Sequence, residues 1–263
     1  MTNQKVVLIT GASSGIGQAT AQLLEDKGFT VFGTSRKPDT NVHPYQMLPL
    51  DVRSDTSVQT AVQSILDQTG RLDVLINNAG YGQFGAIEEN NIADMQLQFD
   101  TNVFGLMRVT NAVLPIMRRQ AGGRIINVSS VLGHVALAYA GLYASSKFAV
   151  EGISEALRQE VLPFNIHVSM VEPSWVKSDF HLTAPAHPIA DYASARQATL
   201  QRVNSRVAIG TKPDEVAQTI LQVVTSPRPR LHYLVGGQAQ LVTAFKRLLP
   251  EPLFEQVWQR LSS

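Results

Sequence analysis

Short apolar runs alternate with amphipathic stretches along most of the chain. Runs rich in β-branched residues predict strands, whereas apolar residues spaced three or four positions apart predict helices. The first pattern predicts strands at 5–10, 30–34, 46–50, 74–76, 124–128, 166–171 and 231–235. The second predicts helices at 17–27, 55–69, 105–117, 142–161 and 214–225. Strand and helix therefore alternate from end to end.

This alternation predicts an α/β fold, because strands linked by helices form a parallel sheet with helices on both faces. We expect a doubly wound sheet of about seven strands in one domain spanning residues 1–263. No repeat, low-complexity segment or linker interrupts the chain.

Two segments depart from the alternation. Residues 174–210 carry no strand signal and contain two prolines, so we expect a loop there. Its apolar residues favour a loop that folds over a substrate site rather than a surface excursion: Trp175, Phe180, Leu182, Ile189 and Tyr192. The tail at about 238–263 is amphipathic and partly basic. We expect it to cover the pocket, pack on the domain or meet another subunit, and a membrane-surface role is the weaker alternative.

Composition excludes several classes of protein. The 22 basic and 21 acidic residues nearly balance, which gives no reason to expect a nucleic acid or an anionic membrane as partner. The chain has no cysteine, so thiolate catalysis and disulfides are excluded. No apolar run reaches the ~18 residues that span a bilayer, and a strand beginning near Lys5 leaves no room for a signal peptide. We therefore expect a cytoplasmic protein.

The first predicted strand runs into a glycine-rich turn and then a helix. The turn reads Thr10-Gly11-Ala12-Ser13-Ser14-Gly15-Ile16-Gly17. Glycines at this place let a pyrophosphate approach the backbone, and the helix N-terminus offers N–H groups and a positive dipole end. The turn lacks the Lys-Ser/Thr pair of an ATP-binding P-loop. It therefore favours a dinucleotide.

Tyr143 and Lys147 lie four residues apart on a predicted helix, which places them on one face. A nearby cation lowers the pKa of a phenol from its usual value near ~10, so Tyr143 could exchange a proton with a substrate oxygen. The alternative is a packed tyrosine beside an exposed lysine. Ser130, upstream of the pair, favours the catalytic interpretation of Tyr143 and Lys147.

Jointly these motifs resemble the short-chain dehydrogenase/reductase family. The resemblance covers about the first 180 residues and rests on residues in the family's order and spacing: Thr10 to Gly17, Asp51-Val52, Asn77-Asn78-Ala79-Gly80, Asn102, Ser130, Tyr143, Lys147 and Pro173. Beyond them the chain looks like bacterial general oxidoreductases and like the branch of 17β-hydroxysteroid and retinol dehydrogenases. The fold implied is Rossmann-type.

The resemblance implies a catalytic set. Tyr143 would be the general acid in reduction and the base in oxidation, and Lys147 would lower its pKa and hold the nicotinamide ribose. Ser130 would donate a hydrogen bond to the substrate oxygen. Asn102 would anchor a water that relays protons to Lys147. Taken singly, Ser130 could instead be a strand-end cap and Asn102 a helix N-cap.

The resemblance also implies the cofactor contacts. Besides Tyr143 and Lys147, these are Gly11, Ser13, Ser14, Gly15, Ile16, Gly17, Asp51, Val52, Asn77, Ala79, Gly80, Pro173, Val176 and Ser178. The segment 77–80 could alternatively be only a strand-ending turn. Two positions depart from the family: Ser174 stands where glycine is usual after the proline, and Ser178 where threonine is frequent. Both keep a small side chain.

The end of the second strand favours NADP(H) over NAD(H). A carboxylate there would hold the ribose 2′-hydroxyl of NAD, but this chain has Arg36 and Lys37 and no acid until Asp39. Arg36 can clamp a 2′-phosphate with two hydrogen bonds, and Ser13 could add a hydroxyl contact. A solvated basic loop is the alternative.

The expected substrate pocket is mainly apolar, with no basic clamp; its residues are Tyr81, Phe84, Leu132, His134, Leu137, Trp175, Phe180 and Leu182. Lys177 lies nearby but is expected to face outward. We expect a hydrophobic ketone, aldehyde or secondary alcohol. His134, His181 and His187 show no metal-ligand spacing with carboxylates, so no metal site and no histidine cluster is expected.

Two functions remain open at this stage. The first is an NADP(H)-dependent carbonyl reductase, and the second is a sensor or scaffold that binds NADP(H) without turnover. Asn102, Ser130, Tyr143 and Lys147 together favour the enzyme. The resemblance also implies a homodimer or homotetramer paired through helices at about 103–117 and 142–161.

Overall fold

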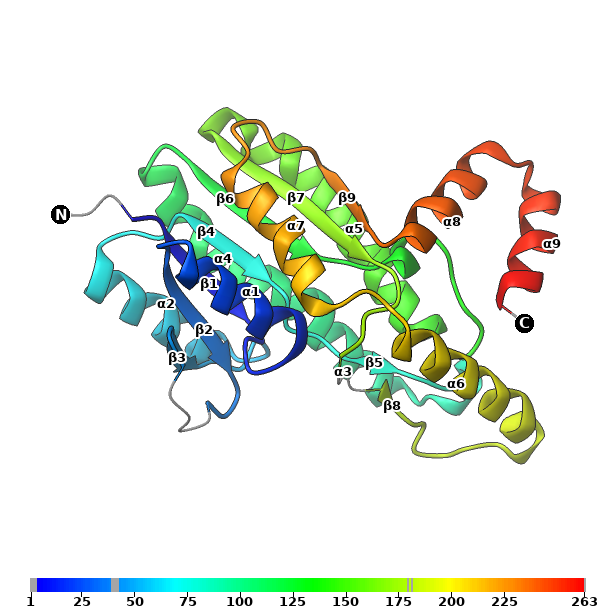
Figure 1. Cartoon of the computed structure of the whole chain (residues 1–263). Coiled ribbons are helices and arrows are strands. Elements are labelled where there is room, and N and C mark those ends of the chain that lie inside the picture. The colour runs from blue at the N-terminus through cyan, green and yellow to red at the C-terminus, as the bar shows by residue number, and fades with distance from the viewer. Residues whose placement is uncertain (1–3, 39–42, 179, 181, 263) are drawn as a thin grey trace.

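The computed structural model describes residues 4–38, 43–178, 180 and 182–262, with side chains as far as Trp258. In this part of the chain seven strands form one parallel sheet in the order β3-β2-β1-β4-β6-β7-β9 (Figure 1). They are β1 (Val6–Thr10), β2 (Thr30–Ser35), β3 (Gln46–Pro49), β4 (Val74–Asn77), β6 (Gly123–Val128), β7 (Ile166–Pro173) and β9 (His232–Val235). The predicted parallel α/β fold is confirmed.

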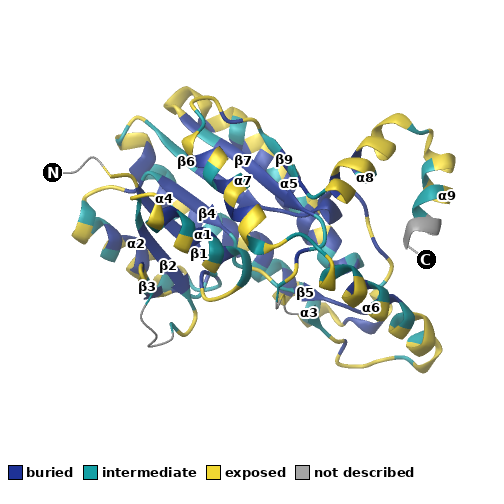
Figure 2. Cartoon of the chain, viewed as in Figure 1, coloured by how far each residue is buried: buried dark blue, intermediate teal, exposed yellow. Residues whose placement is uncertain are grey.

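Helices cover both faces of the sheet (Figure 1). One face carries α1 (Gly15–Asp26) and α7 (Pro213–Thr225), and the other carries α2 (Asp55–Thr69), α4 (Gly105–Arg119) and α5 (Gly141–Val161). The central strands β1 and β4 are buried along their whole length, whereas the edge strand β3 is partly exposed (Figure 2). This is why the strands appear in the sequence as continuous apolar runs and the helices as amphipathic stretches.

Local signals set the helix boundaries. The Ser54 side chain accepts a hydrogen bond from the Ser57 N–H and caps α2, which ends at Gly70 in the left-handed conformation with φ of 70°. Pro213 occupies the first turn of α7, where its missing N–H costs no hydrogen bond. The predicted helix boundaries therefore lie close to the observed ones.

The strand order reverses between β1 and β4. β1 leads outward to β2 and β3 on one side, whereas β4 is followed by β6, β7 and β9 on the other. In open parallel sheets the crevice at the carboxyl ends of the strands at such a point binds ligands. The glycine turn after β1 and the Asn-Asn-Ala-Gly segment after β4 both lie there.

The segment 174–210 is more regular than a loop. It contains β8 (Leu182–Thr183), which pairs with β5 (Gly82–Gln83), and the helix α6 (Ala193–Ala208). The expectation of a loop is wrong for α6. Its sequence is mostly polar, and only a narrow apolar stripe that includes Val203 packs against the domain, so the periodic signal is weak. A further helix missed by the pattern is α3 (Ile92–Phe99).

The amphipathic tail forms two helices, α8 (Gly237–Leu248) and α9 (Glu251–Ser262). They follow β9 at the edge of the sheet (Figure 1). Their apolar residues Val242, Phe254 and Trp258 pack against a third apolar cluster, which also includes Phe84, Leu132 and Val203. None of the helices described is both long and apolar enough to cross a bilayer.

Candidate active site

The turn between β1 and α1 is built for close backbone approach. Gly11 and Gly15 have φ values of 68° and 55°, which disfavour residues with a side chain. A Cβ on Gly17 would lie 2.1 Å from the Gly11 carbonyl oxygen. The first turn of α1 carries no acidic residue, and the Ser14 side chain makes no capping hydrogen bond. The turn therefore leaves N–H groups at a helix N-terminus, which suits a pyrophosphate.

Asn78 and Thr10 fasten this turn to the end of β4. The Asn78 Nδ2 donates to the carbonyls of Thr10 and Gly11 at 3.0 and 2.9 Å. In return the Thr10 hydroxyl accepts from the N–H groups of Asn78 and Ala79, both at 3.0 Å. These hydrogen bonds hold the glycine turn after β1 and the segment after β4 together as one rigid unit.

A cavity of about 680 Å³ opens beside this unit. Most residues expected to contact the cofactor line it: Gly11, Ser13, Ser14, Gly15, Ile16, Arg36, Asp51, Val52, Ala79, Gly80, Tyr143, Lys147, Pro173, Val176 and Ser178. The cavity wall does not include Gly17, Lys37 or Asn77. The glycine cradle and this wall together fit a dinucleotide.

Asn77 lies beneath the cavity and does not itself line it. Its Nδ2 donates to the Thr110 hydroxyl and to the Asn127 Oδ1, both at 3.0 Å, and the residue is buried. It ties β4 to α4 and β6 beneath the cavity instead of lining it. Gly17 likewise packs on the glycine turn, and Lys37 is exposed.

Charged residues gather where β2 and β3 end. Arg53, which the motifs do not single out, lines the cavity and holds Asp51 with two hydrogen bonds of 3.1 and 2.8 Å. This hydrogen bonding lowers the pKa of Asp51, and Arg36 lowers it further. The described end of β2 holds Arg36 and Lys37 without a carboxylate, while Asp39 lies outside the described residues.

Tyr143 and Ser130 meet at the cavity wall. Tyr143 stands in the first turn of α5, and Ser130 follows β6 with extended backbone. Burial raises the pKa of Tyr143 to about 12, while its hydrogen bond with Ser130 lowers it in part. Ser130 also accepts a 3.1 Å hydrogen bond from the Leu132 N–H, so its role as a strand-end cap and its place beside Tyr143 coexist.

Lys147 lies against the Tyr143 ring, and burial is the largest influence on the pKa of each of these two residues. Its Nζ donates a 2.8 Å hydrogen bond to the Val128 carbonyl and lies 5.6 Å from the centre of the Tyr143 ring. The ammonium thus lies over the Tyr143 ring. Burial lowers the pKa of Lys147 to about 8, against a smaller opposing effect of Glu151. Lys147 therefore stays mostly protonated at neutral pH.

Asn102 lies in a π-helical segment, Asp100–Phe104, between α3 and α4. Its Nδ2 donates to the Tyr81 carbonyl at 2.9 Å and to the Ser146 hydroxyl at 3.1 Å, and its Oδ1 accepts from the Tyr81 N–H at 3.1 Å. It is therefore not a helix N-cap. Asn102 joins the turn after β4 to α5 next to Lys147 and lies behind the cavity wall. Such π-segments often occur at functional sites.

The substrate side of the cavity is formed by segments far apart in sequence. Seven of the eight expected pocket residues line it: Tyr81, Phe84, Leu132, Leu137, Trp175, Phe180 and Leu182. The Phe180 ring packs edge-on against Tyr143, with centroids 5.5 Å apart. Further lining residues come from α6, which the sequence pattern missed, and from the tail, for which covering the pocket was one expected alternative; they include Val203, Arg206, Val207, Gln238, Val242 and Trp258. Only the tertiary packing brings these residues to the cavity wall.

Besides Arg36 and Lys147, two further basic residues line this cavity, and one of them lies on the substrate side, where no basic clamp was expected. Arg53 stands at the end near β3, and Arg206 stands at the substrate side with its guanidinium 5.8 Å from the Trp175 ring centre. Lys177 is exposed, as expected. The wall is therefore apolar with one guanidinium on the substrate side.

A buried carboxylate anchors the segment that covers the site. Glu89 accepts hydrogen bonds from the Ala86 and Ile189 N–H groups at 2.7 and 2.8 Å and pairs with Arg196 of α6. Burial raises the pKa of Glu89, but these hydrogen bonds outweigh it and hold the pKa below its usual value. Glu89 thereby attaches the segment that contains Ile189 and Arg196 to the domain, and Glu89 itself does not line the cavity.

Both departures from the family pattern are accommodated. The Ser174 N–H donates to the Val235 carbonyl, and its side chain occupies space that a Cβ on Gly236 would fill, 2.7 Å from the Ser174 Oγ. Ser178 lies against Gly15 of the glycine turn. The turn after β7 therefore keeps its place beside the cofactor cradle.

The expectation that the histidines form no cluster is wrong for His134. It does not line the cavity and instead contacts Glu172, in a group that includes Glu151 and His232. These residues are distant in sequence, so spacing could not reveal them. His187 is exposed, and His181 lies outside the described residues.

Comparisons with known proteins agree with this geometry. The family model for short chain dehydrogenases matches residues 5–187. A 3-ketodihydrosphingosine reductase of Bacteroides thetaiotaomicron is 40% identical over 95% of both chains. Human retinol dehydrogenase 8 is 37% identical, covering 92% of this chain and 85% of its own. A short-chain dehydrogenase structure from Streptomyces avermitilis has a TM-score of 0.87 at 30% identity, covering 100% of this chain and 98% of its own.

Proposed function

The chain belongs to the short-chain dehydrogenase/reductase family of oxidoreductases acting on CH–OH and C=O groups, and from this premise we propose that it is an NADP(H)-dependent reductase of apolar ketones or aldehydes. The observation that carries the proposal is the shared position of Ser130 and Tyr143. Their side chains stand where the glycine-lined cradle and the apolar wall meet in one cavity. A carbonyl held there would lie against both hydroxyls.

The residues act on the substrate oxygen. The bound nicotinamide supplies or accepts the hydride. Ser130 donates a hydrogen bond to the carbonyl oxygen and stabilises the negative charge that develops there. Tyr143, kept protonated at neutral pH by its raised pKa, donates its proton to that oxygen as the alcohol forms. Lys147, mostly protonated, favours the resulting phenolate and holds the ribose hydroxyls. In oxidation the same groups work in reverse.

Two guanidinium groups support the preference for NADP(H). Arg36 and Arg53 both line the cavity at the ends of β2 and β3, where a ribose 2′-phosphate would lie. Asp51, the carboxylate described nearby, is already engaged by Arg53. A 2′-phosphate would therefore meet positive charge, whereas NAD would find no uncommitted carboxylate among the residues described there.

The apolar wall supports a hydrophobic substrate. Trp175, Phe180 and Trp258 come from three separate segments and line the same cavity. Two relatives are named for 3-ketodihydrosphingosine and for retinol, which agrees with this substrate class. We also infer a homodimer or homotetramer, since Phe104 and Phe148, at α4 and α5, are 53% and 42% exposed.

Fluorescence titration with NADPH and NADH tests the cofactor half of the proposal. The wild type should bind NADPH more tightly, and Arg36→Ala should weaken NADPH binding by about 10–100-fold, the worth of one charge-assisted contact, while leaving NADH binding nearly unchanged. Lys27→Ala, an exposed change at the end of α1, serves as the control. Tighter binding of NADH by the wild type would refute the preference.

A series of methyl ketones of increasing chain length tests the substrate half. NADPH oxidation should become more efficient as the alkyl chain grows, because each buried methylene contributes about 0.8 kcal/mol. Efficient reduction of sugars or carboxylate-bearing ketones, with none of the apolar series, would contradict the assignment. Absence of any turnover would favour the sensor or scaffold instead.

A further inference from the structure

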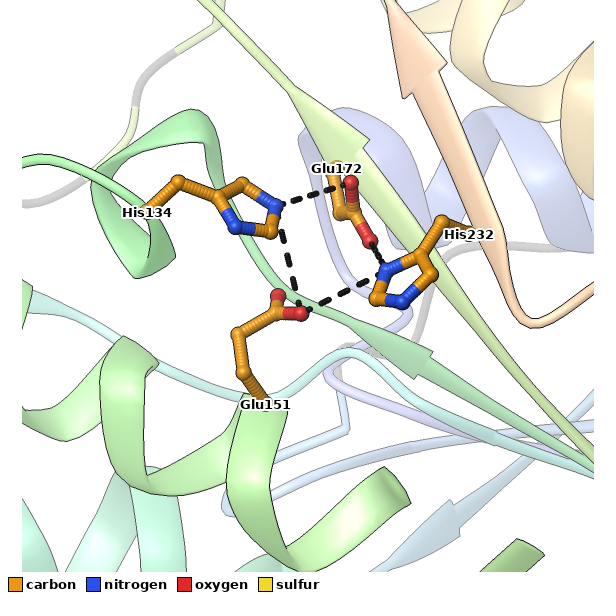
Figure 3. Close-up of side chains that lie close together, drawn as sticks. All are labelled: His134, Glu151, Glu172 and His232. Atoms are coloured by element: carbon orange, nitrogen blue, oxygen red, sulfur yellow. Dashed lines mark hydrogen bonds and ion pairs between the residues drawn. The ribbon is translucent and has the colours of Figure 1, made fainter. Parts of the chain in front are cut away.

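Four side chains of mixed type converge behind the catalytic residues (Figure 3). His134 follows the short 3-10 turn after Ser130, Glu151 lies one helical turn beyond Lys147 on α5, Glu172 precedes Pro173 on β7, and His232 opens β9. One nitrogen or oxygen atom from each can be chosen so that all four lie within 4.8 Å of one another. The group does not line the active-site cavity.

The distances between these atoms resemble those of a small coordination shell. The His134 Nε2 lies 3.1 Å from the Glu172 Oε2, and the His232 Nδ1 lies 2.6 Å from the Glu172 Oε1. The Glu151 Oε2 lies 3.9 and 3.7 Å from the same two ring nitrogens. Tetrahedral ligands at zinc distances of about 2.0–2.1 Å stand about 3.4 Å apart. Side-chain movements on the order of 1 Å would therefore bring one atom from each residue into such a shell.

Glu151 provides an independent sign that a ligand is needed. Its side chain is 8% exposed and points at the two imidazoles; the Ser129 hydroxyl lies near it, but neither carboxylate oxygen makes a well-formed hydrogen bond. Glu172, whose side chain is 1% exposed, lies beside it. Two buried carboxylates side by side are unfavourable unless positive charge or hydrogen bonds compensate them. Two imidazoles offer that compensation only when protonated, whereas a cation offers it directly.

The outer ring nitrogen of His232 lies within ion-pair distance of a third carboxylate. The His232 Nδ1 faces the buried carboxylates, while its Nε2 lies 3.8 Å from the Glu155 Oε1 at the surface. A carboxylate on the outer ring nitrogen is the usual second partner of a metal-bound histidine. Lys246 and Arg247 of α8 lie near His134 and oppose a cation. The three carboxylates of Glu151, Glu155 and Glu172 outnumber these two basic groups.

We propose that His134, Glu151, Glu172 and His232 form a binding site for one divalent transition-metal ion of the zinc class. Two imidazole nitrogens with two carboxylate oxygens suit zinc and its neighbours, whereas magnesium and calcium prefer oxygen ligands alone. With neutral imidazoles the set carries two negative charges, which the ion neutralises. The ion would link the turn after β6, helix α5, β7 and β9, and so stabilise the back of the active site.

Metal analysis of the full-length protein tests the site. Chelator-treated protein is dialysed against Zn²⁺ and its zinc content is measured by mass spectrometry. The wild type should retain one zinc per chain, with a dissociation constant on the order of micromolar or lower. Co²⁺ should give the intense visible absorption of a four-coordinate ion. Zinc should also raise the midpoint of thermal unfolding, because it binds the folded chain.

Three variants establish which residues bind the ion. His232→Gln and Glu172→Gln should each weaken zinc binding by more than about 100-fold and abolish the cobalt spectrum, and Glu155→Gln should weaken it by about 10–100-fold, as loss of an outer partner does. His167→Gln, on β7 but outside the cluster, is the matched control and should bind like the wild type. NADPH titration and circular dichroism confirm that each variant is folded.

The proposal fails if the wild type retains no zinc at one equivalent, which would leave the cluster as a set of histidine–glutamate pairs without a metal. It also fails if folded His232→Gln binds zinc as the wild type does, or if His167→Gln loses as much zinc as the cluster variants. None of these readouts depends on enzymatic activity.

Discussion

The dinucleotide cradle and the substrate wall of the same cavity are constructed differently. The cradle consists of two adjacent strand ends, where Thr10 and Asn78 lock the glycine turn through backbone hydrogen bonds. The wall instead brings together side chains from Trp175, α6, α8 and α9, which pack through apolar contacts. The cradle tolerates almost no added volume, because a methyl group on Gly17 would clash with the Gly11 carbonyl. The shape of the substrate wall depends instead on which side chains line it. Substrate choice can therefore change without disturbing cofactor binding.

Tyr143 stands where the cradle and the wall meet, and its substitution should have the largest effect on turnover. Tyr143→Phe removes the proton donor and leaves the ring in place, so turnover should fall by roughly 10²–10⁴-fold while NADPH affinity changes little. Steady-state kinetics and fluorescence titration measure the two effects. Tyr139→Phe, a change in the neighbouring apolar cluster, is the control and should keep near-normal turnover. Full activity in Tyr143→Phe would refute the role of this hydroxyl.

The cradle should be broken by a single methyl group. Gly17→Ala places a Cβ 2.1 Å from the Gly11 carbonyl oxygen, so the free energy of unfolding should fall by roughly 3 kcal/mol or more and NADPH binding should weaken. Urea unfolding gives the first quantity. Gly152→Ala in α5, where a Cβ meets nothing within 4 Å, should instead stabilise the protein by up to about 1 kcal/mol. Equal effects of the two changes would contradict the packing argument.

Lys147 links both regions, and its burial predicts a pH dependence of stability. Its pKa falls from an ordinary 10.5 to about 8 in the folded state, so between these values the unfolded chain binds more protons. Stability from this group should therefore be lost as pH falls from about 10.5 to about 8, by at most about 1.4 kcal/mol per pH unit.

The difference between wild type and Lys147→Met isolates this contribution. Urea unfolding of cofactor-free, chelator-treated protein should show the wild type losing stability relative to Lys147→Met as the pH is lowered through this window. Lys212→Met, at the exposed N-cap of α7, should run parallel to the wild type. A constant difference between the wild type and Lys147→Met across the window would show that the ammonium is not desolvated.

The wall should respond in a graded and substrate-dependent way. Trp258 lines the cavity and donates a 2.7 Å hydrogen bond to the Ala136 carbonyl. Trp258→Ala should raise KM for long apolar ketones by about 10-fold, since it removes part of a buried aromatic contact, and leave short ketones nearly unaffected. Leu253→Ala, on the same helix and 46% exposed, should change neither. Equal losses for short and long ketones would indicate a general structural defect.

The cradle could be predicted from the sequence, whereas much of the substrate wall could not. The turn at 10–17, the Tyr143–Lys147 spacing and the alternation of strands and helices are local patterns, so the cradle and the sheet could be predicted. The places of Trp258 and of the histidine–glutamate cluster depend on contacts between distant segments, which no spacing reveals. Helix α6 was missed because a mostly polar helix has a weak apolar period. Asn77 belongs to a recognisable motif, but only its contacts with Thr110 and Asn127 show that it lies beneath the cavity.

Hydride transfer in this cavity, between NADP(H) and the carbonyl carbon of an apolar ketone, can be tested directly. The most direct test incubates the protein with NADPH in which both hydrogens at the nicotinamide C4 position are replaced by deuterium and with a long-chain methyl ketone, followed by mass spectrometry of the product. The account predicts an alcohol with deuterium on the carbinol carbon, formed by the wild type and at a much lower rate by Tyr143→Phe. Unlabelled alcohol, or no alcohol across the ketone series despite tight NADPH binding, would contradict it.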